Sequence, residues 1–574
     1  MCKCVEFYRF NALIFRTYCA IMKNIKLYFM AIKMEAKKFI PVASPALIGN
    51  EKKYVLDCLK TNWISSTGKY VNLFERKFSE YIGVKHAITC SNGTVALHLA
   101  LLALDIKNGD EVMCPTLTYI ATANSILYVG AKPIFVDCQQ DTWNIDPDKI
   151  EGKITKKTKA IIVVHLYGNA CDMEAIIKIA KRHGLYIIED SAEALGSKSL
   201  PADRQGKEKM CGSFGDIATF SFFGNKVITS GEGGMVVTNN DEFAKKVALL
   251  KNQGMDTNKR YWHPVLGYNY RLTNVQSAIG LAQLENVKKF IAKRRQIAKM
   301  YSHYLKNIEG ITLPTEKDYT FHSYWMYCIL IEKEYGVDRD RLMGLLEKQG
   351  IQTRPFFYPI HTMPAYQSLH HYGLDVSKEI SRKGINLPTF YNLGEDQIKY
   401  IAHQLVRLKK DIIKNKQGAE YIIKSVDSGD EKKLASFFKV IKKHNLHNFF
   451  HPHPFNLKTA KKIIEISESD KSDLYYLVLD KNEQIAGYFM LRGFDEGYSV
   501  PSFAIVVHPD YMNRGIGKQV TIVAIKICER LKIGKMMLKV YEDNIVAQKM
   551  YRSLNFTFSK SDKKDELVGR LNIR

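Results

Sequence analysis

The chain has 574 residues, enough for about three average domains or for one large enzyme and a smaller module. Hydrophobic residues make up 46% of the sequence and charged residues 25%, a balance that excludes a largely disordered protein. The 84 lysines and arginines outnumber the 59 acidic residues, and the resulting net charge of +25 suits anionic partners. The lysines are scattered, without a basic stripe interleaved with aromatic residues, so we expect no nucleic-acid partner.

Residues 1–33, "MCKCVEFYRFNALIFRTYCAIMKNIKLYFMAIK", are apolar and basic. Four basic residues cut the apolar runs well below the ~18 residues that a membrane-spanning helix needs: Arg9, Arg16, Lys23 and Lys26. We therefore expect an extension ahead of the folded domain, with Met34 as the working start and no membrane partner. The 11 cysteines are dispersed and form no C-x-x-C pair, which indicates neither a disulfide framework nor a metal site and fits the cytoplasm.

Between Lys52 and Leu408, short apolar runs such as "KPIFVDC" and "LYIIED" alternate with longer helix-like segments. This alternation predicts a mostly parallel sheet covered by helices on both faces. Residues 409–420 are polar and lysine-rich with no strand signal, and a new alternation follows them. We therefore expect one domain over residues 34–415 and a second over residues 420–574.

Ligands of open α/β sheets bind at the carboxyl ends of the strands, and four predicted strands are followed there by polar or aromatic residues. Gly93 and Thr94 open a helix, Tyr119 offers an aromatic face, Asp190 ends a buried run, and Lys226 follows "TFSFFG". Each signal alone has an ordinary alternative: a common glycine turn, a core tyrosine, a helix-capping aspartate or a loop lysine. Together they supply the phosphate cup, stacking ring, buried carboxylate and amine that pyridoxal phosphate requires.

Four longer motifs make the first domain specific: "DEVMCPTLTYIATANSILYVGAKPIFVDC", "IIEDSAEALGS", "TFSFFGNKVITSGEGGMV" and "GYNYRLTNVQSAIGLAQLE". They resemble the DegT/DnrJ/EryC1/StrS aminotransferases, above all the perosamine synthase group, over about residues 34–415. The resemblance implies an aspartate-aminotransferase-like α/β fold, with a large mostly parallel sheet domain and a small C-terminal subdomain. It also implies transamination of a nucleotide-linked 4-keto-6-deoxyhexose, with GDP-4-keto-6-deoxymannose favoured and glutamate as the amino donor.

The resemblance assigns roles to individual residues. Lys226 becomes the Schiff-base lysine, and Asp190 keeps the pyridine nitrogen protonated. Glu193 stands where relatives place a Glu, Gln or His beside the cofactor. Tyr119 would stack on the pyridine ring, and the phosphate would be held by Gly93, Thr94 and Ser221. Asn269 would reach the cofactor of the neighbouring subunit in a homodimer.

Two further segments, "TNWISSTGKYV" and "TRPFFYPIHTMPAY", resemble parts of the sugar-nucleotide pocket in this group. They nominate Ser65, Arg354, Tyr358 and His361 as substrate-binding residues. The second segment can equally be a proline-punctuated loop without a ligand.

The C-terminal part reads as two strands joined at Lys481 and Asn482, then a strand, a glycine-containing loop and an amphipathic helix. Gly515 and Gly517 sit at the start of that helix, where free amides can receive a pyrophosphate. Tyr551 lies seven residues after the helix-capping candidate Asn544, so the two share one helical face.

This order resembles the GNAT acetyltransferases over about residues 421–574, with Met512 departing from the usual loop signature. The resemblance implies acetyl-CoA as a co-substrate, bound by Arg514, Gly515, Gly517 and Asn544. Tyr551 matches the tyrosine that protonates the departing thiolate, although it can also be a core aromatic residue. Asp495 or Glu496 could be the base, or could lie in a solvated turn.

Three functions remain open at this stage. The first is a bifunctional enzyme of polysaccharide biosynthesis that aminates a nucleotide sugar and then N-acetylates it. The second keeps the aminotransferase, on a UDP- or dTDP-sugar, while the GNAT domain modifies another amine. The third is a pyridoxal-phosphate-binding regulatory protein without turnover, in which Lys226, Asp190 and Asn269 need not all be present.

Overall fold

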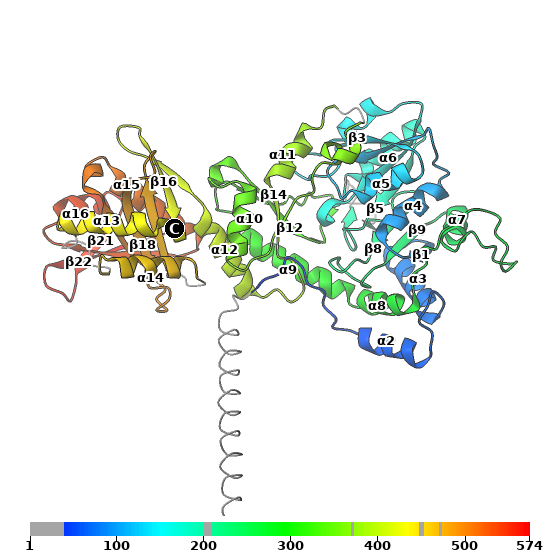
Figure 1. Cartoon of the computed structure of the whole chain (residues 1–574), viewed down its shortest axis with the longest axis horizontal. Coiled ribbons are helices and arrows are strands. Elements are labelled where there is room, and N and C mark those ends of the chain that lie inside the picture. Colours follow the sequence, from blue (N-terminus) through cyan, green and yellow to red (C-terminus); the bar gives the residue numbers. More distant parts are fainter. Residues whose placement is uncertain (1–38, 200–207, 369–371, 447–452, 470–472, 574) are drawn as a thin grey trace, which may run out of the picture.

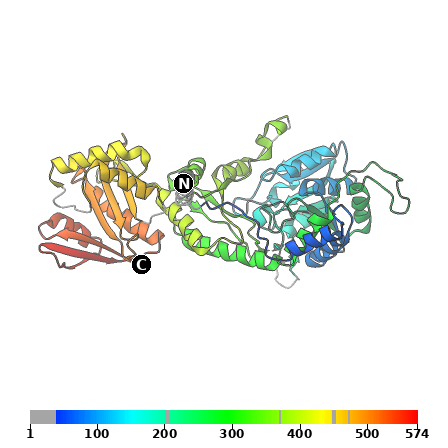
Figure 2. The ribbon, with the colours of Figure 1, turned by 60° about the horizontal axis from the view of Figure 1, so that its bottom comes forward.

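The structure, a computed structural model, describes residues 39–199, 208–368, 372–446, 453–469 and 473–573. The expected extension, residues 1–33, lies outside these ranges. Figures 1 and 2 show a larger lobe and a smaller C-terminal lobe at opposite ends of the molecule. No helix within the described ranges is long and apolar enough to cross a membrane.

The larger lobe is built on a seven-stranded sheet with the order β1-β9-β8-β5-β4-β2-β3. β9 runs antiparallel to both of its neighbours, and every other adjacent pair is parallel. The mostly parallel sheet predicted from the sequence is therefore confirmed. The strands are β1 (His86–Cys90), β2 (Glu111–Pro115), β3 (Lys132–Val136), β4 (Thr158–Val164), β5 (Tyr186–Asp190), β8 (Ile217–Ser221) and β9 (Gly234–Thr238).

Helices cover this sheet on both faces, which explains why its strands are almost continuously apolar. One buried cluster joins α4 to the strands, and a separate one joins α6 to β2, β4 and β5. The helices of this lobe are α2 (Glu51–Lys60), α3 (Lys69–Ile82), α4 (Gly93–Ala103), α5 (Ala121–Tyr128), α6 (Met173–His183), α7 (Asp241–Lys251) and α8 (Asn274–Leu284).

A small subdomain follows, as the sequence predicted. Its antiparallel sheet has the order β10-β12-β14-β13, formed by β10 (Ile311–Thr312), β12 (Tyr327–Ile331), β13 (Arg354–Pro355) and β14 (Gly384–Leu387). A three-stranded sheet, β11-β6-β7, links it to the large lobe through β6 (Lys198–Ser199), β7 (Lys209–Met210) and β11 (Thr320–Phe321). The helices of the small subdomain are α9 (Val287–Leu305), α10 (Arg339–Lys348), α11 (Asp375–Lys383) and α12 (Glu395–Leu408).

The smaller lobe contains an eight-stranded sheet with the order β15-β16-β17-β18-β19-β20-β22-β21. The strands are β15 (Asp411–Lys414), β16 (Glu420–Ser425), β17 (Leu474–Leu479), β18 (Ile485–Arg492), β19 (Ser502–Val507), β20 (Lys535–Tyr541), β21 (Thr557–Lys560) and β22 (Glu566–Asn572). α13 (Glu431–Lys443) and α14 (Leu457–Ser467) pack on one face, and α15 (Ile516–Arg530) packs on the other. α16 (Ile545–Arg552) follows β20.

β19 and β20 are the one parallel pair in this sheet, and they separate after a short contact. Their register is limited to Ser502 with Met537 and Phe503 with Leu538, although both strands continue beyond these residues. The two strands therefore diverge toward their carboxyl ends. The first turns of α15 and α16 follow those ends.

The segment between the lobes differs from the sequence expectation. Residues 409–420 were predicted to lack a strand, and this prediction is wrong, because β15 pairs with β16 from Asp411 opposite Ile423 to Lys414 opposite Glu420. Ile413 is buried while its neighbours Ile412 and Lys414 are exposed, as expected for an edge strand with one packed face. The second sheet thus begins at Asp411, ahead of the boundary expected between residues 415 and 420.

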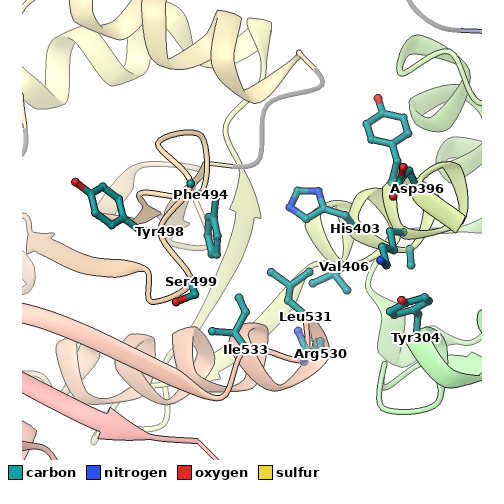
Figure 3. A pocket seen from close by; sticks show the side chains of 14 residues that line it. Tyr304, Asp396, His403, Val406, Phe494, Tyr498, Ser499, Arg530, Leu531 and Ile533 are labelled. Atoms are coloured by element: carbon teal, nitrogen blue, oxygen red, sulfur yellow. The ribbon is translucent and has the colours of Figure 1, made fainter.

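The two lobes share a buried core. One hydrophobic cluster contains Leu405 of α12, Ile413 of β15 and Ile527 of α15. Beside it, a cavity of about 600 Å³ separates α12 from the smaller lobe. Figure 3 shows His403 and Val406 of α12 on one side of this cavity and Leu531, beyond α15, on the other.

Candidate active sites

The carboxyl ends of the central strands meet at a cavity of about 650 Å³ in the larger lobe. Of the residues nominated from the sequence, eight line it: Gly93, Thr94, Tyr119, Asp190, Glu193, Ser221, Lys226 and Arg354. They come from four different strand ends and from the small subdomain. The strand-end argument nominated five of these residues, Gly93, Thr94, Tyr119, Asp190 and Lys226, and the family resemblance nominated Glu193, Ser221 and Arg354.

Lys226 lies in the turn after β8, largely shielded from solvent. Its Nζ atom is 3.6 Å from Oε1 of Glu193 and 3.8 Å from the ring centroid of Trp325. Burial lowers the pKa of this amine, and the nearby carboxylates of Glu193 and Asp190 oppose that effect. A buried lysine with a lowered pKa is the form of the side chain that can act as a nucleophile.

Asp190 ends β5 and is buried. The Thr122 hydroxyl donates to its Oδ2 at 2.9 Å, and the Ala192 amide donates to its Oδ1 at 3.2 Å. Burial raises the pKa of this carboxyl, while these two hydrogen bonds favour its charged form. The carboxylate is thus held in one orientation at the edge of the cavity.

Glu193 is buried three residues further along the chain. Its Oε2 accepts a hydrogen bond from the Tyr167 amide at 2.8 Å, while Oε1 faces Lys226. Burial raises the pKa of Glu193 to about 7, with the Lys226 charge acting in the opposite direction. A carboxyl that titrates near neutral pH beside an amine can both accept and return a proton.

An anion cradle forms the other end of the cavity. α4 begins at Gly93, and the first-turn residues Gly93, Thr94 and Val95 line the cavity; the Asn92 side chain accepts a hydrogen bond from the Val95 amide. A Cβ atom on Gly93 would lie 2.9 Å from Cβ of Ser221, so only glycine lets the two segments approach this closely. Amides of a helix N-terminus beside the Ser221 hydroxyl suit a phosphate group.

The remaining nominated residues of this lobe do not line the cavity. Ser65 and Tyr358 are exposed, and the Ser65 carbonyl accepts a hydrogen bond from the Asn274 amide. His361 is buried, and its Nδ1 lies 2.7 Å from the Thr116 hydroxyl. Asn269 is exposed and accepts two hydrogen bonds from the Arg271 guanidinium.

Sequence reasoning missed three residues that line or shape the cavity. Trp325 covers Lys226, Phe357 lies 5.7 Å from Tyr119 between ring centroids, and Thr122 orients Asp190. Trp325 and Phe357 come from the small subdomain, far along the chain from the strand ends that form the rest of the cavity. Thr122 was detectable, because it stands three residues after Tyr119 at the start of α5.

The second nominated site surrounds the diverging strands of the smaller lobe. Gly515 precedes α15 with a φ of +82°, no side chain caps that helix, and Gly517 lies in its first turn. Asn544 caps α16 by accepting from the Ala547 amide, which confirms the cap predicted from the sequence. Tyr551 is buried on α16, and burial raises the pKa of its phenol, which therefore stays protonated. Asp495 and Glu496 are exposed in the loop between β18 and β19.

Comparisons with known protein families identify both lobes. The model of the DegT/DnrJ/EryC1/StrS aminotransferase family matches residues 45–406. The chain belongs to this family. The model of the acetyltransferase (GNAT) family matches residues 441–556, so the smaller lobe is a GNAT acetyltransferase domain. The protein is an enzyme of the pyridoxal-phosphate-dependent aminotransferase family with an added acetyltransferase domain.

Individual relatives cover the larger lobe. The GDP-perosamine synthase of Escherichia coli O157:H7 is 50% identical over 375 residues, which are 65% of this chain and 100% of that protein. A Helicobacter pylori structure, PseC, titled an aminotransferase involved in pseudoaminic acid biosynthesis, is 32% identical with a TM-score of 0.59, covering 64% and 98% of the two chains. The PLP form of the putative sugar aminotransferase Spr1654 from Streptococcus pneumoniae is 27% identical with a TM-score of 0.60, covering 64% and 97%.

The cavity of this chain fits pyridoxal phosphate. Lys226 supplies a shielded amine, Asp190 an oriented carboxylate, and α4 with Ser221 a cradle that a Cβ at Gly93 would fill. Tyr119 presents an exposed ring at the cavity. The donor set therefore has one group for each part of the cofactor.

Proposed function

We propose that this enzyme transfers an amino group from glutamate to a nucleotide-linked 4-keto-6-deoxyhexose and then N-acetylates the new amine. The observation that carries the first half is the meeting of Lys226, Asp190 and Glu193 in one cavity of a chain that is 50% identical to a GDP-perosamine synthase. That similarity favours GDP-4-keto-6-deoxymannose as the sugar substrate. The second candidate substrate is a UDP- or dTDP-linked sugar, which no residue of the cavity favours over the GDP-linked sugar.

The residues divide the work of amino transfer. Pyridoxal phosphate, when bound, supplies the electron sink for the reaction. Asp190 would hold a positive charge at the pyridine nitrogen, and Gly93, Thr94 and Ser221 would hold the phosphate. Glu193, 3.6 Å from Lys226, is placed to take and return the lysine proton.

Substrate recognition falls to residues at the cavity mouth. Arg354 lines the cavity and offers a guanidinium to the anionic nucleotide sugar. Ser65, Tyr358 and His361 lie outside the cavity of this single chain, so Ser65 and the exposed Tyr358 are better placed for a substrate shared with a second copy. Buried His361 is better placed to support the loop around Tyr358 through Thr116.

A homodimer is part of this proposal. Exposed apolar side chains crowd the loop that precedes Asn269, notably Tyr261, Trp262 and Leu266. Large exposed aromatic and aliphatic groups in one loop favour contact with another protein surface. Contact with a second copy would carry Asn269 toward the partner's phosphate cradle. The reaction is placed in the cytoplasm, where the free cysteines among the described residues stay reduced.

The acetyltransferase domain would use the product of the first reaction. The sugar amine attacks the acetyl carbon of acetyl-CoA, the carbon–sulfur bond breaks, and Tyr551 donates its proton to the departing thiolate. Water or a base takes the proton that the amine nitrogen loses, and Tyr551 is reprotonated from solvent. Arg514, Gly515, Gly517 and Asn544 surround the open ends of β19 and β20, where the acetyl donor would enter. The second candidate acceptor is an unrelated amine, such as a protein lysine or a polyamine.

The test offers the intact enzyme a panel of GDP-, UDP- and dTDP-linked 4-keto-6-deoxyhexoses with pyridoxal phosphate, glutamate and acetyl-CoA. Mass spectrometry should detect a 4-acetamido-4,6-dideoxyhexose nucleotide, made fastest from the GDP sugar. A 4-amino product that stays unacetylated, while a polyamine or a protein is acetylated, would refute the second half. If no sugar of the panel gives an amino product, the proposed amino transfer is refuted. That result would support the alternative of a regulatory protein without turnover.

A further inference from the structure

The amine of Lys226 faces an aromatic ring as well as carboxylates. Its Nζ atom lies 3.8 Å from the ring centroid of Trp325, well inside the range of about 6 Å over which an indole face attracts a cation. Trp325 is 4% exposed and the Lys226 side chain 13% exposed. Little water therefore competes for this contact, and indole gives the strongest attraction among the aromatic side chains.

Trp325 is held in this place by three contacts. Its indole Nε1–H donates to the carbonyl of Asn225, the residue before Lys226, at 2.8 Å. Its own carbonyl accepts a hydrogen bond of 2.6 Å from the buried Arg294 guanidinium of α9. The Tyr167 ring is stacked beside the indole, with 6.2 Å between centroids and 22° between planes. The small subdomain therefore presents a fixed ring face to the amine.

Two carboxylates also act on Lys226, those of Glu193, 3.6 Å from Nζ, and of Asp190. The other titratable side chains that line the cavity are Tyr119, Glu232 and Arg354. A carboxylate binds an ammonium group by accepting one of its hydrogens, and it can then take the proton itself. An aromatic face attracts the whole positive charge and has no site for a proton. Contact with Trp325 thus stabilises the ammonium form without deprotonating it.

We infer that Trp325 is a catalytic residue of amino transfer, and that its ring face holds the protonated form of the Lys226 amine. In the division of work proposed above, Glu193 takes the lysine proton and returns it. Burial works against the charged amine, and the ring face offsets part of that penalty. The inference rests on the amino-transfer half of the proposed function, but on no assignment of the sugar and on nothing in the acetyltransferase domain.

A ring that only shielded Lys226 from water would have the opposite effect on the amine. Removal of a shield admits water, which favours the ammonium form and raises the pH at which half of the amine is protonated. Removal of a ring face that binds the charge lowers this midpoint. The sign of the change in midpoint therefore separates the two roles of Trp325.

Competitive labelling of the full-length, cofactor-free protein measures the midpoint. Acetic anhydride reacts with the neutral amine, so the labelling rate of the peptide that carries Lys226, followed by mass spectrometry between neutral and alkaline pH, reports the protonated fraction. Trp325→Leu should lower the midpoint by about one pH unit, a tenfold change in the ratio of charged to neutral amine. Trp325→Phe keeps a ring face and should lower it less.

Phe357→Leu is the matched control for labelling. It removes another aromatic ring that the small subdomain contributes to the same cavity, but one that stacks on Tyr167 and does not lie over Lys226. Its midpoint should equal that of the wild type. An equal fall in Phe357→Leu and Trp325→Leu would overturn the inference, because the effect would then belong to the cavity wall in general.

Fluorinated tryptophan tests the same contact without changing the shape of the residue. Fluorine withdraws electron density from the indole face, so protein made with mono-, di- and trifluorotryptophan should show midpoints that fall in steps. Trp325 lines the cavity, whereas Trp63, Trp143 and Trp262 do not. A midpoint that does not fall in the fluorinated protein overturns the inference, whether or not Trp325→Leu folds.

The half-reaction with glutamate adds a readout on the enzyme loaded with pyridoxal phosphate. Trp325→Leu should slow it about tenfold, and Trp325→Phe should restore most of the rate, in step with the labelling midpoints. A wild-type enzyme that shows no amino transfer from glutamate, although its midpoint falls on fluorination, would refute the proposed function and leave the contact between Trp325 and Lys226 established.

Discussion

The Nζ atom of Lys226 lies 3.6 Å from Oε1 of Glu193, and both side chains are shielded from solvent. Burial raises the pKa of the carboxyl to about 7 and lowers that of the amine. The two groups therefore approach each other in proton affinity, although their ordinary values lie far apart. Such a pair exchanges a proton at lower cost than the same two groups do in water, and an uncharged neighbour of Lys226 could not take part in that exchange.

Glu193→Gln should change how stability depends on pH in the cofactor-free protein. The folded-state pKa of Glu193 lies above its unfolded value of 4.5, so its contribution to stability is fully present below pH 4.5 and is lost as pH rises to about 7. Glutamine does not titrate and still accepts the Tyr167 hydrogen bond. Relative to the wild type, the variant should gain up to about 3 kcal/mol of unfolding free energy between pH 5 and pH 8.

Urea unfolding at the two pH values measures this gain. Phe357→Leu alters a cavity residue that does not titrate, so its difference from the wild type should be the same at both pH values. If the difference in unfolding free energy between Glu193→Gln and the wild type is also independent of pH, burial does not raise the pKa of Glu193.

Asp190→Asn should nearly stop amino transfer while leaving the fold intact. Asparagine has the same size, its oxygen can accept from the Ala192 amide, and its Nδ2 can donate to the Thr122 hydroxyl. It lacks the charge aimed into the cavity, so we expect a loss on the order of a hundredfold to a thousandfold in single-turnover rate. Pyridoxal phosphate should still be retained on dialysis.

Asp137→Asn is the matched control for this variant. Asp137 is another buried carboxyl after a strand end, but it accepts from the Ser377 amide and hydroxyl, and it lies outside the cavity. Its substitution should lower stability and leave the rate per folded molecule within about twofold of the wild type. Equal rate losses in the two variants would assign Asp190 a structural role.

The cavity could be predicted from the sequence to the extent that it is built from strand ends. Asp190 and Lys226 each follow an apolar run, and parallel strands bring such positions to one edge of a sheet. Trp325 could not be predicted, because its place over Lys226 depends on how the small subdomain folds back. Ser65 and Asn269 show a further limit, since a motif does not say whether its side chain faces its own cavity or that of another copy.

The linker strand escaped sequence reasoning for a different reason. In "DIIK" the two isoleucines are adjacent and flanked by charged residues, which gives no clear alternation. What makes the strand is tertiary: Ile413 enters the shared core and Asp411 meets Arg530, 119 residues later. Propensity over four residues carries no information on either contact.

Asp411→Ala should destabilise the acetyltransferase domain strongly. It leaves the buried guanidinium of Arg530 without its partner and removes the carboxylate 2.8 Å from Lys409 Nζ. Breaking a buried pair on one side costs about 3–5 kcal/mol, whereas removing the exposed Lys414 from its pair with Glu420 should cost no more than about 1 kcal/mol. Hydrogen exchange of β16 and α15 measures both, and equal protection in the two variants would contradict the prediction.

By the same reasoning, a fragment that starts at residue 420 should be less stable than one that starts at residue 409. The shorter fragment loses β15, exposes the face that Ile413 covers, and leaves Arg530 without its partner Asp411. Comparison of soluble yield and melting temperature for the two fragments tests where the domain begins. Equal behaviour would place the boundary after β15, as the sequence suggested.

Tyr551→Phe should slow acetyl transfer about a hundredfold without weakening CoA binding. The phenol is buried and its pKa is raised by that burial, so it stays protonated and can donate to a departing thiolate. Phenylalanine keeps its packing against Phe556.

Tyr511→Phe is the control, because it removes a hydroxyl of the same domain that instead donates to Asp480 at 2.7 Å. Stopped-flow measurement of thiol release, with calorimetric CoA affinity on the same samples, separates the two effects. A Tyr551→Phe enzyme that releases thiol as fast as Tyr511→Phe would show that Tyr551 is a core residue, and that another group or water protonates the thiolate.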